Sequence, residues 1–403
     1  MNLFDKVKKL HIVGASGIGV SALAEILRQK GAAVSGSDIE TTGHKPENVP
    51  ADTELLIYSN AVAEDNPERE RARELRIKEM SYPEALGEFI SDKKVIAVAG
   101  TNGKTTTTAM IGWIMEKAGY DPTVIVGSKV LAWDSNAQLG KSEWVVIEAD
   151  EYKRAFLNYR PDIAVITNIA LDHLDYYKDL DDIKKAFSEF RSNLKPGGVL
   201  IENTVVEPSE NLNLQVPGRF NRENAAAAAA AAKALGISED KIRSGLASFT
   251  GTWRRFERVG KLDKAEIISD YAHHPDGVRV TLEAAAAAYK SKKILAVFQP
   301  HQHNRTKKLF KEFVSAFCGA DYVNDFVISE IFDVAGREEN KDQDVSSKDL
   351  VREIQKSGKN VSYASDLADC EKQIRDRVHD FDAIIIMGAG DIYKVADDLV
   401  EKT

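Results

Sequence analysis

Short apolar runs along this chain alternate with longer stretches in which apolar residues recur at helical spacing. This alternation predicts strands joined by helices, the pattern of parallel sheets in α/β proteins. In the first part of the chain we expect a charged helical stretch over 64–80. Before it, we expect a strand at 10–14, a helix at about 18–30, a strand ending at Asp38 and a strand at about 54–62.

The same pattern continues through two more α/β units. For the second unit we expect strands at 94–99, 123–127, 143–149, 163–167 and 198–202, and helices at 104–118, 180–193 and 221–235. The third unit has apolar runs at 267–272, 293–299, 325–331 and 383–390. Gly251 and Thr252 are the predicted second hinge, which gives domains at 1–91, 92–250 and 251–403.

Composition and charge narrow the class of protein. The net charge of -9 argues against a nucleic-acid binder that relies on a basic surface. The two cysteines, Cys318 and Cys370, are far apart, which argues against a disulfide framework or a zinc site and fits a reducing cytosol. The sequence shows no signal peptide and no apolar run long enough to span a membrane, so we expect a cytoplasmic protein without membrane insertion.

The stretch VIAVAGTNGKTTTTAM predicts a phosphate-binding loop between a strand and a helix. Backbone N–H groups in such a turn point at an anion, and the glycines let the backbone approach it. Lys104 would reach the β- and γ-phosphates of ATP, and the Thr105 hydroxyl would bind Mg²⁺. The predicted nucleotide-binding residues of this loop are Gly100, Thr101, Asn102, Gly103, Lys104, Thr105 and Thr106.

Acidic residues and a histidine follow the next two predicted strands. Glu148 and Asp150 end one strand, and Asp172, His173 and Asp175 follow another. Ligands of an open α/β sheet bind at the carboxyl ends of its parallel strands. Because carboxylate oxygens suit Mg²⁺ and a second ion could bind beside an imidazole, these positions predict a magnesium site for phosphoryl transfer.

Two further pairs are candidates for nucleotide contacts. Asn221 and Asn224 stand at the start of a predicted helix, where an amide could pair with an adenine edge or simply cap the helix. Arg254 and Arg255 stand at the predicted hinge, where one of them could reach a γ-phosphate.

An earlier glycine turn, Gly14 to Gly19, also follows a strand and opens a helix. With Asp38 ending the next strand, the turn is similar to a dinucleotide fingerprint, although Ser16 stands where that pattern has glycine. We interpret the turn as a second site for a phosphate-bearing ligand. An NAD-dependent oxidoreductase is the alternative interpretation.

Collinear motifs along the whole chain resemble those of the Mur ligase family, and most closely its alanine-adding branch. They include HIVGASGIGVSALAEIL, YSNAVAEDNPE, AVAGTNGKTTTTAM, VVIEADEY, AVITNIALDHLDYY, GRFNRENAAAA, SDYAHHPD, FQPHQHNRT and MGAGDIYK. The resemblance implies a Rossmann-like UDP-binding domain, a central P-loop ATPase domain with a mostly parallel sheet, and a Rossmann-like amino-acid-binding domain. It implies that ATP phosphorylates the carboxylate of UDP-N-acetylmuramate and that L-alanine attacks the acyl phosphate, in peptidoglycan precursor synthesis.

The resemblance also assigns roles to particular residues. It implies catalytic roles for Lys104, Glu148, His173 and Arg254 or Arg255, with Thr105, Glu148 and His173 binding Mg²⁺. It places Asn221, Asn224, Asp270 and His273 beside the nucleotide. It places Ser16, Gly17, Gly19 and Asp38 at UDP-N-acetylmuramate, and His301 and Arg305 at the amino acid.

The chain differs from the family pattern at a few places. Asn102 stands where the alanine-adding branch usually has histidine, Lys153 stands where aspartate is common, and the segment between SGSD and GHKPENVP is short. The alternatives are a recycling ligase that adds a tripeptide to the same nucleotide, and a nucleotide-binding scaffold without activity.

Overall fold

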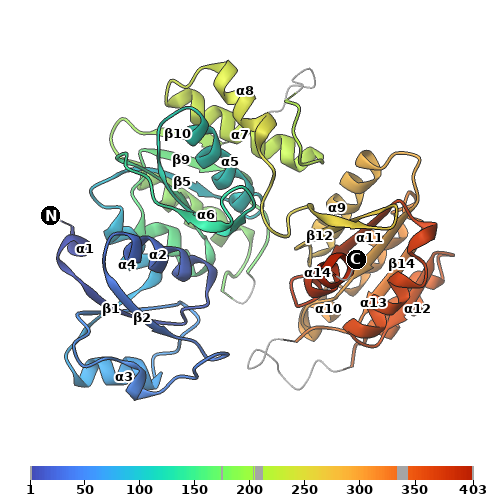
Figure 1. Cartoon of the computed structure of the whole chain (residues 1–403), viewed down its shortest axis with the longest axis horizontal. Coiled ribbons are helices and arrows are strands. Elements are labelled where there is room, and N and C mark those ends of the chain that lie inside the picture. Colours follow the sequence, from blue (N-terminus) through green and yellow to red (C-terminus); the bar gives the residue numbers. More distant parts are fainter. Residues whose placement is uncertain (1, 174–175, 203, 205–211, 334–343, 402–403) are drawn as a thin grey trace. The chain divides into compact units, whose positions relative to one another are not determined.

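The computed structural model describes residues 2–173, 176–202, 204, 212–333 and 344–401 (Figure 1). The chain divides into two compact units. One unit comprises Met1–Gln215 with Arg222–Thr252, and the other comprises Val216–Asn221 with Trp253–Thr403. Over the described residues, the strands form three sheets, two in the first unit and one in the second, so the predicted α/β class with mostly parallel sheets is confirmed.

The N-terminal sheet is parallel throughout, with strand order β2-β1-β3-β4. Its strands are β1 (Lys9–Val13), β2 (Ala33–Ser37), β3 (Leu55–Tyr58) and β4 (Lys78–Ser81). Its helical segments are α1 (Leu3–Lys6), α2 (Ile18–Gln29), η1 (Pro46–Asn48), α3 (Pro67–Glu74) and α4 (Tyr82–Phe89).

The predicted helix over 64–80 is wrong in its last part. Asn66 caps α3 by accepting from the backbone of Glu68, and the helix ends at Glu74 with Leu75 as its C-cap. The chain then enters β4, an edge strand of which no residue is fully buried. Such a strand lacks the apolar run that marks a buried one.

The central sheet has strand order β10-β9-β5-β8-β6-β7 and is parallel apart from β7. Its strands are β5 (Lys94–Ala99), β6 (Thr123–Val130), β7 (Ser135–Gln138), β8 (Trp144–Glu148), β9 (Ile163–Ile166) and β10 (Val199–Glu202). Its helical segments are α5 (Lys104–Lys117), η2 (Tyr152–Asn158), α6 (Leu180–Ser192), α7 (Arg219–Ala234) and α8 (Glu239–Ser248). The strands and helices predicted here are all present.

One continuous core joins these first two sheets. It runs from Phe4 and Leu23 beside the N-terminal sheet to Phe156 and Phe190 beside the central one. Phe156 stacks on Phe190 with ring centroids 4.8 Å apart. Burial of large aromatic side chains at this junction is a strong stabilising contribution, so the two sheets share one packed body.

The sheet of the second unit has strand order β11-β12-β16-β13-β14-β15 and is parallel apart from β11. Its strands are β11 (Glu257–Leu262), β12 (Ala265–Asp270), β13 (Ile294–Phe298), β14 (Asp325–Ser329), β15 (Asn360–Ala364) and β16 (Ala383–Met387). Its helical segments are α9 (Pro275–Ala288), α10 (His303–Lys308), α11 (Phe310–Cys318), α12 (Ser347–Gln355), α13 (Leu367–Arg375), η3 (Val378–Asp380) and α14 (Tyr393–Glu401). Two clusters of buried apolar residues pack against this sheet, one containing Phe298 and the other containing Ile386.

Candidate active site

The loop between β5 and α5 has the backbone of an anion-binding turn. Gly103 caps α5 with a φ of 86°. A Cβ atom at Gly103 would come within 2.3 Å of Asn224 Oδ1, so glycine is required here both by conformation and by space. The N-terminus of α5 therefore opens onto the turn from Gly100 to Gly103, as the sequence predicts.

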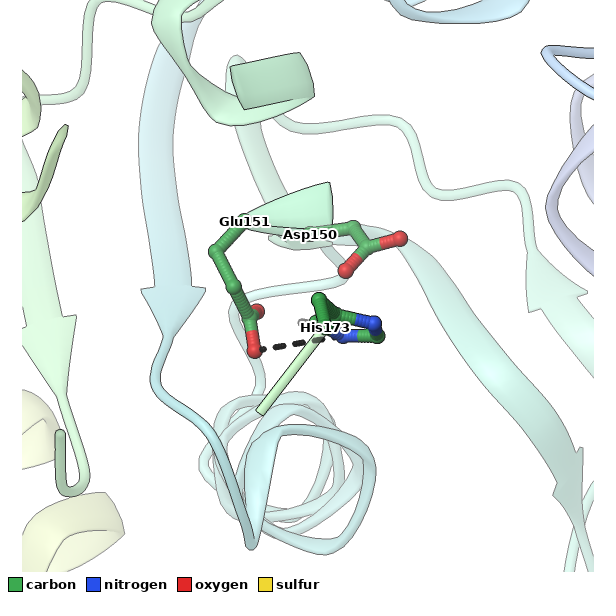
Figure 2. A group of neighbouring side chains, drawn as sticks. All are labelled: Asp150, Glu151 and His173. Atoms are coloured by element: carbon green, nitrogen blue, oxygen red, sulfur yellow. Dashed lines mark ion pairs between the residues drawn. The ribbon is translucent and has the colours of Figure 1, made fainter. Parts of the chain in front are cut away.

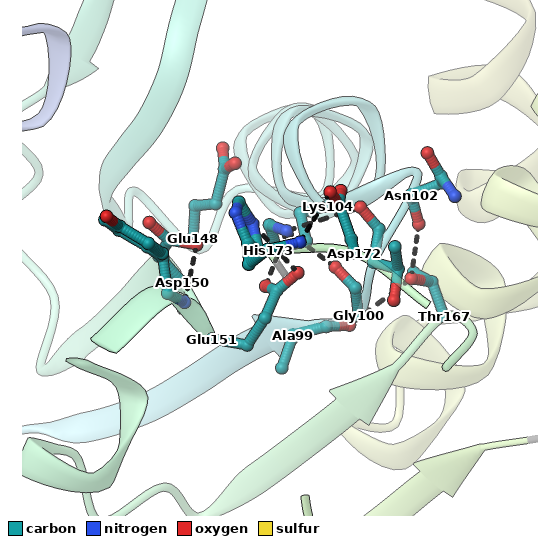
Figure 3. A network of polar contacts seen from close by, with 12 residues as sticks. Ala99, Gly100, Asn102, Lys104, Glu148, Asp150, Glu151, Thr167, Asp172 and His173 are labelled. Carbon is teal, nitrogen blue, oxygen red and sulfur yellow. Dashed lines mark hydrogen bonds and ion pairs between the residues drawn. The ribbon is translucent and has the colours of Figure 1, made fainter. Parts of the chain in front are cut away.

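Lys104 is held in this turn by the backbone and by a carboxylate. Its ammonium donates to the Gly100 carbonyl at 2.7 Å and to Glu151 Oε2 at 2.6 Å (Figure 3). The Lys104 side chain is 13% exposed and the Glu151 side chain is 2% exposed. Burial alone would lower the pKa of Lys104, but the charges of Glu151, Asp150 and Glu148 outweigh it and raise that pKa.

Thr105 and Glu148 meet beside the same turn. The Thr105 hydroxyl donates to Glu148 Oε1 at 3.0 Å, and the Gly127 N–H donates to Glu148 Oε2 at 2.7 Å. Burial raises the pKa of Glu148, although Lys104 and these donors oppose the shift. The predicted pair of metal-binding groups, Thr105 and Glu148, is thus brought into direct contact.

Asp150, Glu151 and His173 form a second cluster of groups that could hold a metal ion (Figure 2). Each offers one ligand atom, and these atoms lie within 4.8 Å of one another. His173 Nε2 lies 3.8 Å from Glu151 Oε1, and that buried oxygen has no hydrogen-bond partner among the described residues. A buried carboxylate oxygen without a donor is costly, so a cation fits this position.

Sequence reasoning missed Glu151, which is the carboxylate that contacts both Lys104 and His173. It stands directly after Asp150, in the turn where β8 gives way to η2. The Tyr177 hydroxyl, in the segment that follows β9, donates to the Glu151 carbonyl at 2.6 Å and so fixes this turn. Three acidic residues within the four-residue stretch EADE were the available signal. Asp175 lies outside the described residues.

The rest of the phosphate loop is tied to the segment after β9. The N–H groups of Thr101 and Asn102 donate to the backbone and side-chain oxygens of Asn168. Thr167 and Asn168 donate in turn to the Asn102 carbonyl at 2.6 and 2.8 Å. Asn168 was not among the predicted residues. Thr106 is buried in the first turn of α5.

The two asparagines of α7 differ in their surroundings. Asn224 lies over Gly103, next to the phosphate loop. Asn221 belongs to the other compact unit and donates from its side chain to the Pro217 carbonyl at 2.7 Å. The geometry therefore supports a nucleotide contact for Asn224 more directly than for Asn221.

In the second unit, Arg254 and Arg255 also differ. Arg254 is 4% exposed, donates to the carbonyls of Gly388 and Gly390, and packs against the rings of Tyr271 and Tyr393. Arg255 is half-buried, with its guanidinium 5.1 Å from the Tyr271 ring centroid. Of the two, Arg255 is the better candidate for an anion.

Asp270 ends β12, and its carboxylate accepts hydrogen bonds from groups within the protein. It accepts from the N–H groups of Phe256 and Ala272 at 2.7 and 2.8 Å and from the Thr281 hydroxyl. Burial raises its pKa. These contacts organise the turns on both sides of β12.

His273, His301 and Arg305 come together in the second unit. The rings of His273 and His301 are 5.9 Å apart, and Arg305 Nη1 lies 3.3 Å from His301 Nδ1. Burial, together with the charge of Arg305, lowers the pKa of His273 to about 3, so this imidazole is neutral at pH 7. Arg305 thus supplies positive charge at the predicted amino-acid site.

At the N-terminal sheet, the glycine turn from Gly14 to Gly19 lies next to Asp38, the residue that follows β2. The Ser16 N–H donates to Asp38 Oδ2 at 3.0 Å. Gly17 caps α2, and Gly19 follows in its first turn against the Tyr82 ring. The predicted ligand residues of this turn are therefore adjacent in space.

The chain belongs to the Mur ligase family. Three family models match it in order: the Mur ligase family catalytic domain at 9–94, the middle domain at 98–207 and the glutamate ligase domain at 254–390. The UDP-N-acetylmuramate–L-alanine ligase of Caldanaerobacter subterraneus is 35% identical over 460 residues, covering 99% of this chain and 98% of the relative. Family membership sets the oxidoreductase alternative aside.

Solved structures agree with this assignment. The UDP-N-acetylmuramate–alanine ligase of Thermotoga maritima superposes with a TM-score of 0.82 at 27% identity, covering 98% of both chains. A murein peptide ligase of Psychrobacter arcticus shares the fold, with a TM-score of 0.66 at 22% identity and 98% of both chains covered. None of the helices in the described part of the chain has the length and hydrophobicity that a membrane-spanning helix requires.

Proposed function

We propose that this protein is an ATP-dependent ligase that joins L-alanine to UDP-N-acetylmuramate in peptidoglycan precursor synthesis. The observation that carries the proposal is the phosphate loop, with Lys104, Thr105 and three carboxylates around it, in a chain that matches alanine-adding relatives over nearly its whole length. The cytoplasmic location remains a prediction from the sequence.

The chemistry proceeds in two transfers. A carboxylate oxygen of the muramate attacks the γ-phosphorus of ATP, the bond to the β-phosphate oxygen breaks, and ADP leaves. The amine nitrogen of L-alanine then attacks the carbonyl carbon, phosphate leaves with the former carboxylate oxygen, and the amine loses a proton. Phosphorylation is needed because a free carboxylate is a poor acyl donor.

Residues of the phosphate loop hold the transferring group. Backbone N–H groups of Gly103 and of the first turn of α5 bind phosphate oxygens, and Lys104 neutralises charge on them after leaving Glu151. Asn224 is positioned against the same loop. Arg255 supplies a further cation for phosphate.

Thr105, Glu148, Asp150, Glu151 and His173 would hold Mg²⁺. The donor set fits, because it combines carboxylates, a hydroxyl and an imidazole, and one buried carboxylate oxygen accepts no hydrogen bond within the described part of the chain. When bound, Mg²⁺ neutralises charge as the two anionic groups approach. In the second unit, Arg305 binds the carboxylate of L-alanine through its planar fork of donors, with His301 beside it.

The proposal is tested by ADP release from purified protein supplied with ATP, Mg²⁺, UDP-N-acetylmuramate and single amino acids. We expect L-alanine to stimulate release more than glycine, L-serine or D-glutamate. Stimulation by an L-alanyl-γ-D-glutamyl tripeptide but not by L-alanine would instead identify a recycling ligase. No stimulation by any acceptor would favour the scaffold alternative.

A further inference from the structure

A buried carboxylate in the N-terminal sheet has no part in the chemistry described above. Glu68, the second residue of α3, is 0% exposed. Its Oε2 accepts from His11 Nε2 at 2.8 Å and from the Ser37 hydroxyl at 2.6 Å. Its Oε1 accepts from His44, the Lys45 N–H and Asn48 at 3.0, 3.3 and 3.0 Å.

These donors lie on both sides of one short loop. Ser37 ends β2 immediately before Asp38, whereas His44, Lys45 and Asn48 follow the loop's far end. Between them, the N–H groups of Thr41, Thr42 and Gly43 all donate to the Asp38 carbonyl. One carboxylate thus fixes the entry and the exit of residues 38–43.

The loop presents two features to a ligand. Asp38 reaches back to the Ser16 N–H of the glycine turn. Ile39 is 74% exposed, the highest value among the large apolar side chains at the surface of the described chain. A ligand that covered the Ile39 side chain would remove this apolar surface from water, which favours binding.

We propose that Glu68 is a positioning residue for the UDP-linked substrate: it clamps both ends of the loop 38–43 so that Asp38 and Ile39 are in place before that substrate binds. The inference rests on the proposed function, because the ligand of this turn is the nucleotide of UDP-N-acetylmuramate. Fixing a loop in advance increases affinity, since less conformational entropy is lost on binding.

The charge state of Glu68 supports the clamp. Burial opposes ionisation of the carboxyl, but hydrogen bonds from His11, Ser37, Asn48 and His44 outweigh it and lower the pKa to about 2. Glu68 is therefore ionised at neutral pH, and its hydrogen bonds are charge-assisted.

The test is Glu68→Gln, which keeps the shape but places a donor among donors. We expect KM for UDP-N-acetylmuramate to rise about tenfold while kcat and KM for ATP stay within about twofold, the signature of binding lost equally from the ground state and the transition state. Amide hydrogen exchange should accelerate over 38–48. Asn48→Ala and His44→Ala each remove one donor on the loop's far side, and they should shift the same KM in the same direction.

Asp162→Asn is the matched control. Asp162 accepts from the Val95 N–H at 2.7 Å and from Lys195 at 2.8 Å beside the central sheet. This variant should lower the unfolding temperature without changing KM for the UDP substrate.

If Glu68→Gln behaves like the control, or if exchange over 38–48 is unchanged, Glu68 is purely structural. If Glu68→Gln does not fold, an unchanged KM in both loop-side variants overturns the clamp. A wild-type protein without L-alanine-dependent ADP release would instead contradict the proposed function.

Discussion

At the scale of single residues, the ion pair between Lys104 and Glu151 links stability to chemistry. Both side chains are largely buried. Removing one partner of a buried pair leaves an uncompensated charge, whereas replacing both is often nearly neutral. A loop lysine that sequence alone would treat as a surface residue is thus part of the packed interior.

We therefore predict that Lys104→Ala abolishes ATP turnover and destabilises the protein by about 3 kcal/mol. The double variant Lys104→Ala with Glu151→Gln should recover most of the stability and none of the turnover. Denaturant unfolding and ADP release measure the two effects. Retained turnover in Lys104→Ala would remove the phosphate-loop assignment.

Substitutions of Arg254 and Arg255 should also differ in their effects, one mainly on stability and the other mainly on catalysis. Arg254→Ala removes a buried cation that binds two carbonyls, so we expect loss of stability of about 3 kcal/mol or more. Arg255→Ala should leave the unfolding temperature nearly unchanged and lower kcat roughly a hundredfold or more, because phosphate-contacting arginines act in the transition state. Melting curves and kcat for both variants check this, and the reverse pattern would exchange the two roles.

Glu68 gives a prediction for acid stability. Its folded pKa of about 2 lies below the ordinary value of 4.5, so it stabilises the fold above pH 4.5. That contribution is lost as the pH falls from 4.5 towards 2, and it amounts to about 3 kcal/mol for a shift of this size. Unfolding free energies measured between pH 6 and about 3 should fall more steeply in wild type than in Glu68→Gln. Equal slopes would contradict the assignment.

At the scale of elements, the sequence predicted buried strands well and edge strands poorly. The missed strands β4, β7, β11 and β15 are all edges of their sheets. An edge strand is exposed along one side, so its residues need not be apolar, and the pattern that marks β5 or β16 is absent.

The strand-to-helix turns were predictable because they depend on glycine chemistry. In Gly103→Ala, the alanine would have to adopt a left-handed φ, and its Cβ would clash with Asn224. We therefore expect KM for ATP to rise at least about tenfold. Gly119→Ala at the other end of α5 is the control, because its φ is 87° but no described residue beyond its chain neighbours lies within 4 Å of the added Cβ. Gly119→Ala should cost about 1 kcal/mol of stability and leave KM for ATP unchanged. Equal effects on KM would show that the backbone conformation, not the contact with Asn224, determines binding.

At the scale of the whole molecule, motif order indicated the family and the sheet class, but contacts made across the chain were not predictable. Glu151 and Asn168 bind the phosphate loop from distant segments, and Glu68 closes a loop at 38–43. Such partners depend on how strands are ordered in a sheet, which periodicity does not specify.

The account depends centrally on transfer of a phosphoryl group to the muramate carboxylate. The most direct measurement uses UDP-N-acetylmuramate labelled with heavy oxygen in that carboxylate, with ATP, Mg²⁺ and L-alanine, and mass analysis of the phosphate released. The account predicts that one labelled oxygen leaves with each phosphate and that the other remains in the new amide. Unlabelled phosphate, or label appearing in AMP, would contradict it.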